Sequence, residues 1–107
     1  MTLKIKLLLR FGWYRIWSDE FIEQGSYLTS VTNADTLYTV TFVKIFKNIN
    51  YFFTNQIQCN RAIGNGWDSG CLDEVNSSRT TSKTEVTTDG ISNTKAHYGI
   101  RWHAQGY

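Results

Sequence analysis

Apolar and polar side chains alternate with a period of two along several stretches of the chain. The clearest stretch is 97–107, where small or apolar residues take the even positions and most odd positions are polar or basic. This alternation is typical of a β-strand with one face in a core. It predicts further strands at 3–11, 38–43 and 51–60. The first of these is expected to place five side chains on one face: Leu3, Ile5, Leu7, Leu9 and Phe11.

The pattern of turns agrees with an all-β fold. Gly, Asn and Asp residues separate the strand patterns, and proline is absent. No long window favours the i, i+3, i+4, i+7 stripe of an α-helix, although residues 44–48 are expected to form one helical turn. Several short strands at this spacing predict an antiparallel β-sandwich or barrel.

Length and composition limit the class of protein. A chain of 107 residues with 41% hydrophobic and 15% aromatic content predicts one domain, 1–107, with a packed core. A domain of this size has a high ratio of surface to volume, which favours help from a partner subunit. The net charge of +2 is too small to indicate nucleic-acid binding. No apolar run is long enough to span a membrane as a helix.

Cysteine and histidine could carry chemistry, but their spacing argues against a metal centre. Cys59 and Cys71 cannot form one alone, and two interpretations stay open: a disulfide, or two small buried apolar groups. His97 and His103 are six residues apart, roughly 20 Å along an extended strand. Copies of one histidine from several subunits could still meet at an ion. Polar residues at a subunit seam are the favoured interpretation, so no metal or cofactor is expected.

Four segments, taken in order, resemble a known family. LLLRFGW at 7–13 resembles the "GLIIQWG" opening strand of phage tail-fibre C-terminal domains of the Gp53-like type. TVTFVKIFKN at 39–48 is similar to their "VTFPxAF" segment, and TTDGIS at 87–92 to their "TTTGFTI" strand. IRWHAQGY at 100–107 resembles their terminal "RWIAIGY".

The resemblance implies a small, lectin-like β-sandwich of the H-type, assembled as a homotrimer at the distal tip of a tail fibre. Residues 1–6 are then expected to be the end of a preceding shaft or simply the start of the chain. The sequence departs from the family pattern at Val43, where proline is usual, and in a longer segment at 60–78. His103 and Gln105 also replace apolar residues of the last strand.

Sugar binding is the site chemistry that the sequence favours. An aromatic plate for the apolar sugar face, next to polar side chains for the hydroxyl groups, is typical of such sites. The irregular segment 60–78 offers this set, although Trp67 could instead fill a small core of the loop. The expected ligand-binding residues are Arg61, Asn65, Trp67 and Asp68, followed by Arg79, Arg101 and His103 at a subunit groove. Three tryptophans in or beside the patterned strands are expected in the core: Trp13, Trp17 and Trp102.

Catalysis is not expected. Neighbouring carboxylates such as Asp19 and Glu20 point to opposite faces of a strand, and no G-x-S-x-G motif is present. The function that the resemblance implies is a receptor-binding tip that recognises a bacterial surface glycan or an outer-membrane protein, without inserting into the membrane. It would belong to the virion and be assembled in the host cytoplasm. The alternatives are a stand-alone lectin-like module and, less favoured, a small polysaccharide depolymerase.

Overall fold

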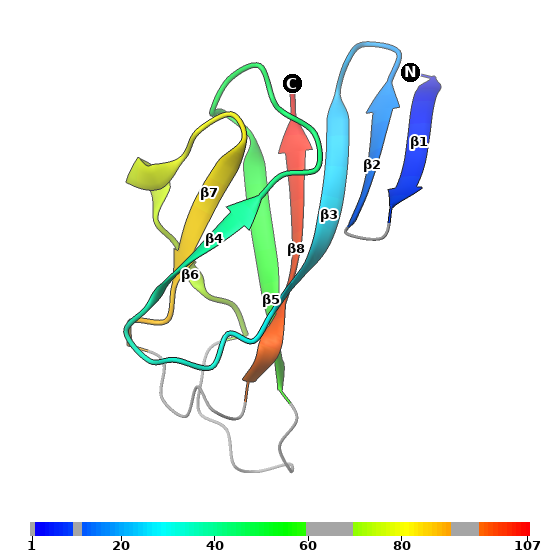
Figure 1. Cartoon of the computed structure of the whole chain (residues 1–107). Coiled ribbons are helices and arrows are strands. Elements are labelled where there is room, and N and C mark those ends of the chain that lie inside the picture. The colour runs from blue at the N-terminus through cyan, green and yellow to red at the C-terminus, as the bar shows by residue number, and fades with distance from the viewer. Residues whose placement is uncertain (1, 10–11, 60–69, 91–96) are drawn as a thin grey trace.

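The chain folds into two antiparallel β-sheets that face each other (Figure 1). The computed structural model describes residues 2–9, 12–59, 70–90 and 97–107, without the side chains of Leu9, Cys59, His97 and Tyr98. Sheet A contains, in spatial order, β1 (Leu3–Leu9), β2 (Gly12–Trp17), β3 (Ile22–Thr29), β8 (His97–Gly106) and β5 (Phe52–Cys59). Sheet B contains β4 (Leu37–Thr41), β7 (Lys83–Thr87) and β6 (Asp73–Glu74), and a single 3₁₀ turn, η1 (Asn76–Ser78), follows β6. The predicted all-β sandwich is confirmed.

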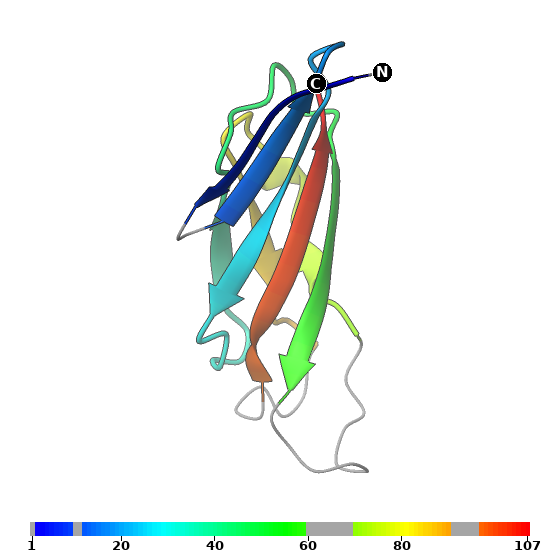
Figure 2. The ribbon, with the colours of Figure 1, turned by 90° about the vertical axis from the view of Figure 1, so that its right-hand side faces the viewer.

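The core lies between the sheets. Strand β8 lies between β3 and β5 in sheet A, as Figure 2 shows, and sends Ile100, Trp102 and Ala104 inward. From sheet B, Val40 and Val86 are buried against them. Removing these side chains from water is the main stabilising contribution to such a fold. The alternation read from 97–107 is therefore confirmed for the side chains that the structure describes, with Arg101 and His103 on the opposite face. Within the described ranges, no helix has the length and apolar character needed to cross a membrane.

Aromatic rings from the connection between β4 and β5 complete the core. Phe42 meets Phe46 and Tyr51 edge to face, with ring centroids 5.2 and 4.8 Å away. The Phe46 and Tyr51 rings stack at 4.8 Å. Residues 44–48 form bends and not the expected helical turn, so that prediction is wrong. The physical reason is that the backbone of Lys44 is hydrogen-bonded to the side chain of Gln24 on sheet A, which replaces a helical pattern.

Two side-chain amides fasten crossing segments to sheet A. Gln24, fully buried, donates from Nε2 to the Lys44 carbonyl (2.7 Å) and accepts from the Lys44 N–H at Oε1 (2.8 Å). On β5, Asn55 donates to the Leu72 carbonyl (3.0 Å) and accepts from the Leu72 N–H (2.8 Å). Each amide copies the pair of hydrogen bonds that a neighbouring strand would make, so both segments are tied down without extending a sheet.

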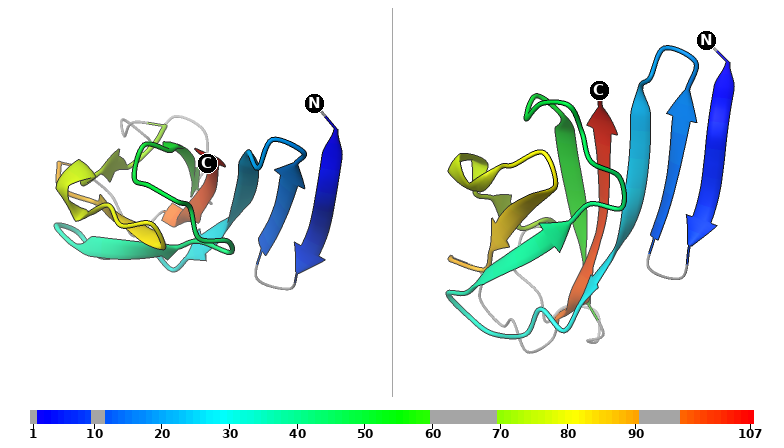
Figure 3. Two further views of the ribbon diagram at one scale, coloured as in Figure 1. Left: turned by 90° about the horizontal axis from the view of Figure 1, so that it is seen from above. Right: turned by 45° about the horizontal axis from the view of Figure 1, so that its top comes forward.

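Strands β1 and β2 extend beyond the area that sheet B covers, as both views in Figure 3 show. Ile5 and Leu7 therefore each keep 40% of their surface exposed. The prediction that this strand has one common apolar face is wrong at Leu3, because a bulge lies between Leu3 and Ile5, and for Leu9 and Phe11 it lies outside the described side chains. Leu3 pairs with Trp17, whereas Ile5 pairs with Ile16, so Leu3 is turned to the other side.

Candidate functional site

The candidate site lies on the outer face of sheet A, the face turned away from sheet B. Antiparallel register aligns side chains of neighbouring strands in rows across this face. One row runs from Trp13 on β2 through Gly25 on β3 and His103 on β8 to Thr54 on β5. These strands are joined by backbone hydrogen bonds, so the sheet holds the row as a rigid support for a ligand.

Gly25 allows the Trp13 ring to lie across β3. A Cβ atom at position 25 would stand 3.0 Å from Nε1 of Trp13 and 2.7 Å from the carbonyl oxygen of Trp102. Without that atom, the indole reaches the imidazole of His103, with ring centroids 5.7 Å apart and planes inclined by 32°. The glycine thus creates the gap in which two aromatic rings from strands that are not neighbours meet.

Glu23 fixes the polar half of this surface. Its carboxylate accepts two hydrogen bonds from Arg15, at 3.0 and 2.9 Å, and a third from the Trp17 indole at 2.6 Å. Nε2 of His103 lies 3.9 Å away. The hydrogen bonds from Arg15 and then Trp17 hold the pKa of Glu23 below its ordinary value, against the opposing effect of burial. In turn, the Arg15 guanidinium lies over the rings of Trp13 and Trp17, at 5.4 and 5.9 Å from their centroids.

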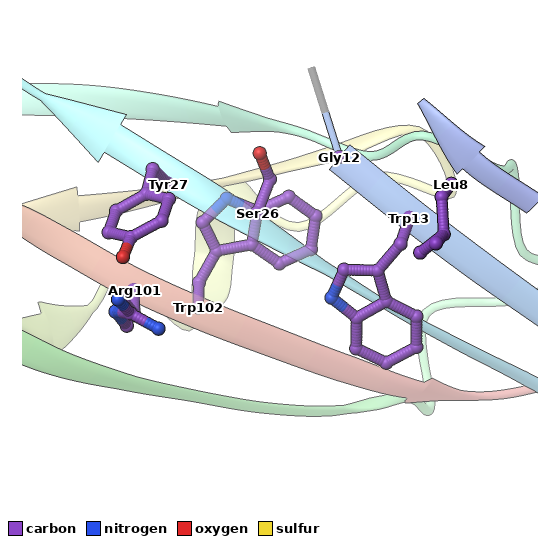
Figure 4. Close-up of a pocket in the computed structure, with 7 residues that line it drawn as sticks. All are labelled: Leu8, Gly12, Trp13, Ser26, Tyr27, Arg101 and Trp102. Carbon is purple, nitrogen blue, oxygen red and sulfur yellow. The ribbon is translucent and has the colours of Figure 1, made fainter. Parts of the chain in front are cut away.

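Arg101 lies on the same face, beside the aromatic row. Its guanidinium group packs over the Tyr27 ring, 4.4 Å from the ring centroid. A hollow of about 360 Å³ lies here, at the start of β2. Figure 4 shows Tyr27 and Arg101 at one end of the hollow, with Leu8 and Trp13 at the other. The remaining residues along the hollow are Gly12, Ser26 and Trp102.

A second hollow of about 240 Å³, lined mostly by polar residues, adjoins the first. Thr54 and Gln56 of β5 line it together with Arg101 and His103 of β8. Arg101 borders both hollows and therefore joins an aromatic half to a polar half. We call this combined surface the outer groove and define it by seven side chains: Leu8, Trp13, Tyr27, Thr54, Gln56, Arg101 and His103.

Of the residues predicted from sequence, the structure brings Arg101 and His103 together in the outer groove. Arg79 lies elsewhere, beside sheet B, and its donors are used within the protein. It donates to both carboxylate oxygens of Glu74 at 2.8 Å and to the carbonyls of Ile49 and Tyr51 at 2.8 and 2.6 Å. Its guanidinium group also packs over the Tyr51 ring, at 4.3 Å. The contacts of Arg79 are those of a structural side chain, and the outer groove does not include it.

The predicted loop site lies outside the described residues. It comprises Arg61, Asn65, Trp67 and Asp68. The proposed pairing of Cys59 with Cys71 also depends on a side chain outside the described set, that of Cys59, and Cys71 is exposed. Both predictions therefore stay predictions.

Sequence reasoning missed the aromatic members of the groove. Trp13 and Trp17 were expected in the core, but both lie half-buried on the outer face, and only Trp102 is a core residue, at 6% exposure. The segment WYRIW does indicate an outward position for both tryptophans. Arg15 lies two residues from each of them, so all three side chains share one face of the strand, and a charged residue favours the solvent face. Tyr27 carried no comparable signal, since its partner Arg101 is distant in sequence.

Comparison with known proteins supports the fold. No protein-family model and no curated protein sequence matches the chain. Among solved structures, that of an N-truncated R2-type pyocin tail fibre is similar, with a TM-score of 0.65 and 17% sequence identity over 96% of this chain. The chain spans 37% of the length of that fibre chain. The two-layer β fold is therefore one that also occurs within a tail fibre.

Proposed function

We propose that the chain is the receptor-binding domain at the distal tip of a phage-type tail fibre. The observation that carries this proposal is the likeness in fold to the pyocin tail fibre over 96% of the chain. The four ordered segments that resemble the Gp53-like type, with its H-type-lectin sandwich, point the same way. On this proposal the domain belongs to the virion and is assembled in the host cytoplasm.

The outer groove is the surface we propose for receptor contact. Trp13 and Tyr27 offer aromatic faces for the C–H face of a sugar ring, and Thr54 and Gln56 offer donors and acceptors for hydroxyl groups. The receptor is a glycan or an outer-membrane protein of the bacterial surface. Because all of these side chains come from strands, the groove is formed before the ligand arrives, which lowers the entropic cost of binding.

Binding without catalysis is the proposed mode of action. Among the residues that the structure describes, Glu23 is the carboxylate beside the groove, and its oxygens accept hydrogen bonds from Arg15 and Trp17. A carboxylate held ionised in this way is a poor general acid, which a glycosidase requires. The proposal needs no metal or cofactor. Release of reducing ends from host polysaccharide by the purified protein would contradict it and favour a depolymerase.

We further propose a homotrimer, in which weak sites gain strength by acting together. The uncovered strands β1 and β2 support this part of the proposal, since Ile5 and Leu7, on the face opposite to the outer groove, are each 40% exposed. Apolar surface of this kind is typical of subunit contacts. Light scattering in solution should report three times the mass of one 12.4 kDa chain. A 12.4 kDa particle would contradict the trimer.

Adsorption to bacterial cells tests the proposed function. Fluorescently labelled protein is mixed with a panel of bacterial strains, and the bound fraction is measured after sedimentation. Tyr27→Ala should weaken adsorption about tenfold or more, because it removes an aromatic contact of the groove. Leu37→Ala is the matched control, since Leu37 is an exposed apolar residue of sheet B, 56% accessible. The proposed function would be contradicted if the unmodified protein bound none of the strains.

A third variant separates the groove from the loop. Trp67→Ala removes the aromatic side chain that the sequence favoured and should leave the oligomer folded. If the loop takes part in binding, adsorption by this variant falls as well. Adsorption at the unmodified level would remove the loop from the site and leave the outer groove as the receptor-contacting surface.

A further inference from the structure

Positive charge predominates on the outer face of sheet A. The cross-strand register places one acidic side chain on this face among the described residues, against three basic ones: Glu23 against Lys6, Arg15 and Arg101. Glu23 is paired with Arg15 in a two-pronged ion pair, at 3.0 and 2.9 Å, so those two charges neutralise each other. The charge left over at the groove itself is that of Arg101.

Arg101 is held in place without losing its hydrogen-bonding capacity. A guanidinium group that packs over a ring uses its flat face, and its N–H donors lie in the plane of the group. The 4.4 Å contact with Tyr27 therefore orients Arg101 while leaving those donors directed outward. Within the described part of the chain, no carboxylate forms an ion pair with Arg101, and the side chain is exposed to solvent. This arrangement suits a two-pronged hydrogen bond to an external anion.

The surroundings of Arg101 define the rest of the ligand. On one side, Trp13 and Leu8 provide an apolar wall in the hollow of about 360 Å³. On the other side, Thr54 and Gln56 provide uncharged polar groups in the hollow of about 240 Å³. A ligand that satisfies the whole groove combines an anionic group with a flat apolar face and several hydroxyl groups.

We infer that the outer groove binds an acidic saccharide, a sugar chain that carries a carboxylate or a phosphate group. The anionic group meets the N–H donors of Arg101, and the apolar face of a sugar ring lies on Trp13. The inference rests on the proposed function and adds the chemical class of the receptor. Carboxylate and phosphate each present a pair of oxygen atoms that can accept two parallel hydrogen bonds from a guanidinium group.

The size of the groove favours a saccharide over an acidic segment of a protein. A stable protein interface covers roughly 800 Å² on each partner, with a broad apolar centre. The two hollows are small and meet at Arg101, and hollows of this size suit single sugar rings on either side of one charge. An outer-membrane protein as the receptor is therefore the outcome that would contradict the inference.

Matched ligands and matched variants test the inference. The protein, immobilised on a biosensor, is presented with two pairs of ligands: oligogalacturonate with its methyl ester, and phosphorylated with unphosphorylated oligomannose. The first pair tests a carboxylate and the second a phosphate. Arg101→Gln removes the charge but keeps a polar side chain, and Arg101→Lys keeps the charge without the fork. Lys83→Gln, on exposed sheet B surface, is the control for loss of one charge.

The unmodified protein should bind an acidic ligand at least about tenfold more tightly than its neutral partner. Arg101→Gln should remove that preference, Arg101→Lys should keep part of it, and Lys83→Gln should keep all of it. An equal response of the unmodified protein and Arg101→Gln to every ligand would overturn the inference, as would cell adsorption that is lost on protease treatment of the cells. The proposed function would survive either result, provided that cells still adsorb the protein. Conversely, Arg101-dependent binding of an acidic ligand without adsorption to any cell would support the inference and contradict the cell-surface role.

Discussion

The Trp13 indole and the His103 imidazole meet across a strand that separates them, with ring centroids 5.7 Å apart. Trp13 belongs to β2 and His103 to β8, and the intervening residue of β3 is Gly25. This contact links the aromatic half of the outer groove to its polar half. The contact exists because residue 25 is a glycine. A larger side chain at this position would separate the two rings.

Gly25→Ala should separate these rings. The new Cβ would stand 2.7 Å from the Trp102 carbonyl oxygen, which belongs to the backbone and cannot move aside easily. We expect the free energy of unfolding to fall by about 1–3 kcal/mol, as for other overpacked sites. The near-ultraviolet circular dichroism of the tryptophans should change as well. Gly70→Ala is the control, since a Cβ there meets nothing within 4 Å, and unchanged spectra and stability for both variants would contradict this role of Gly25.

Glu23→Gln should lower stability in a pH-dependent way. The carboxylate is 15% exposed and accepts hydrogen bonds from Arg15 and Trp17, so its neutral replacement should cost about 1–3 kcal/mol near neutral pH. The pKa of Glu23 is lowered in the folded state, so at moderately acidic pH the unfolded chain binds more protons. The contribution of Glu23 is therefore fully present above the ordinary value of 4.5 and is lost as the pH falls through the lower, folded value.

Urea unfolding of both proteins between pH 7 and pH 2 checks this expectation. The difference in the free energy of unfolding between the unmodified protein and Glu23→Gln should be largest at neutral pH and should shrink below about pH 4.5. A difference that stays constant over the whole range would show that the charge of Glu23 contributes nothing to stability.

Gln24→Leu should loosen the connection between β4 and β5. The substitution leaves the N–H and the carbonyl of Lys44 without the partners that Gln24 supplies at 2.8 and 2.7 Å. We expect a loss of about 2–3 kcal/mol in the free energy of unfolding and faster hydrogen exchange at the Lys44 amide. Gln24→Glu keeps the acceptor for the Lys44 N–H but turns a donor into an acceptor facing the carbonyl, so it should also destabilise. Native protection of the Lys44 amide in both variants would contradict the account.

Tyr107→Phe should raise the pKa of Asp19. The Tyr107 hydroxyl donates a hydrogen bond to Oδ2 of Asp19 at 2.7 Å, and this bond is the largest cause of the lowered pKa of that carboxyl. The ring contact between Phe21 and Tyr107, at 5.2 Å, should survive because it does not need the hydroxyl. Carbon-13 NMR of the carboxyl group, followed through acid titration, measures the change. An identical titration curve in both proteins would show that the bond does not persist in solution.

The sequence predicted the parts of the fold that depend on one strand at a time. From 99 to 107, where the side chains are described, inward and outward positions are right because both faces of β8 lie in constant surroundings, one against sheet B and one on the outer face. The first strand was less predictable. A bulge between Leu3 and Ile5 changes the face to which the side chains point. A pattern of apolar residues does not reveal a bulge. The helical turn expected at 44–48 failed because a distant side chain, Gln24, binds that backbone.

The candidate site was harder to predict, because it depends on register between strands. Arg101 and His103 were candidates from their outward parity alone. Their partners Tyr27 and Trp13 lie on other strands, and only the pairing of β2, β3 and β8 brings them together. Large aromatic residues are also usually expected in the core. For Trp13 and Trp17 this tendency predicts burial, whereas their place on the same strand face as the charged Arg15 predicts exposure. The second prediction agrees with the structure.

Mapping the bound ligand on the protein shows directly whether the outer groove contacts the receptor. Polysaccharide purified from a strain that adsorbs the protein is titrated into isotope-labelled protein, and backbone amide shifts are followed by NMR. We expect the largest shifts at Trp13, Tyr27, Arg101 and His103, on the outer face of sheet A. Shifts confined to sheet B, with the outer groove unchanged at saturation, would contradict this expectation.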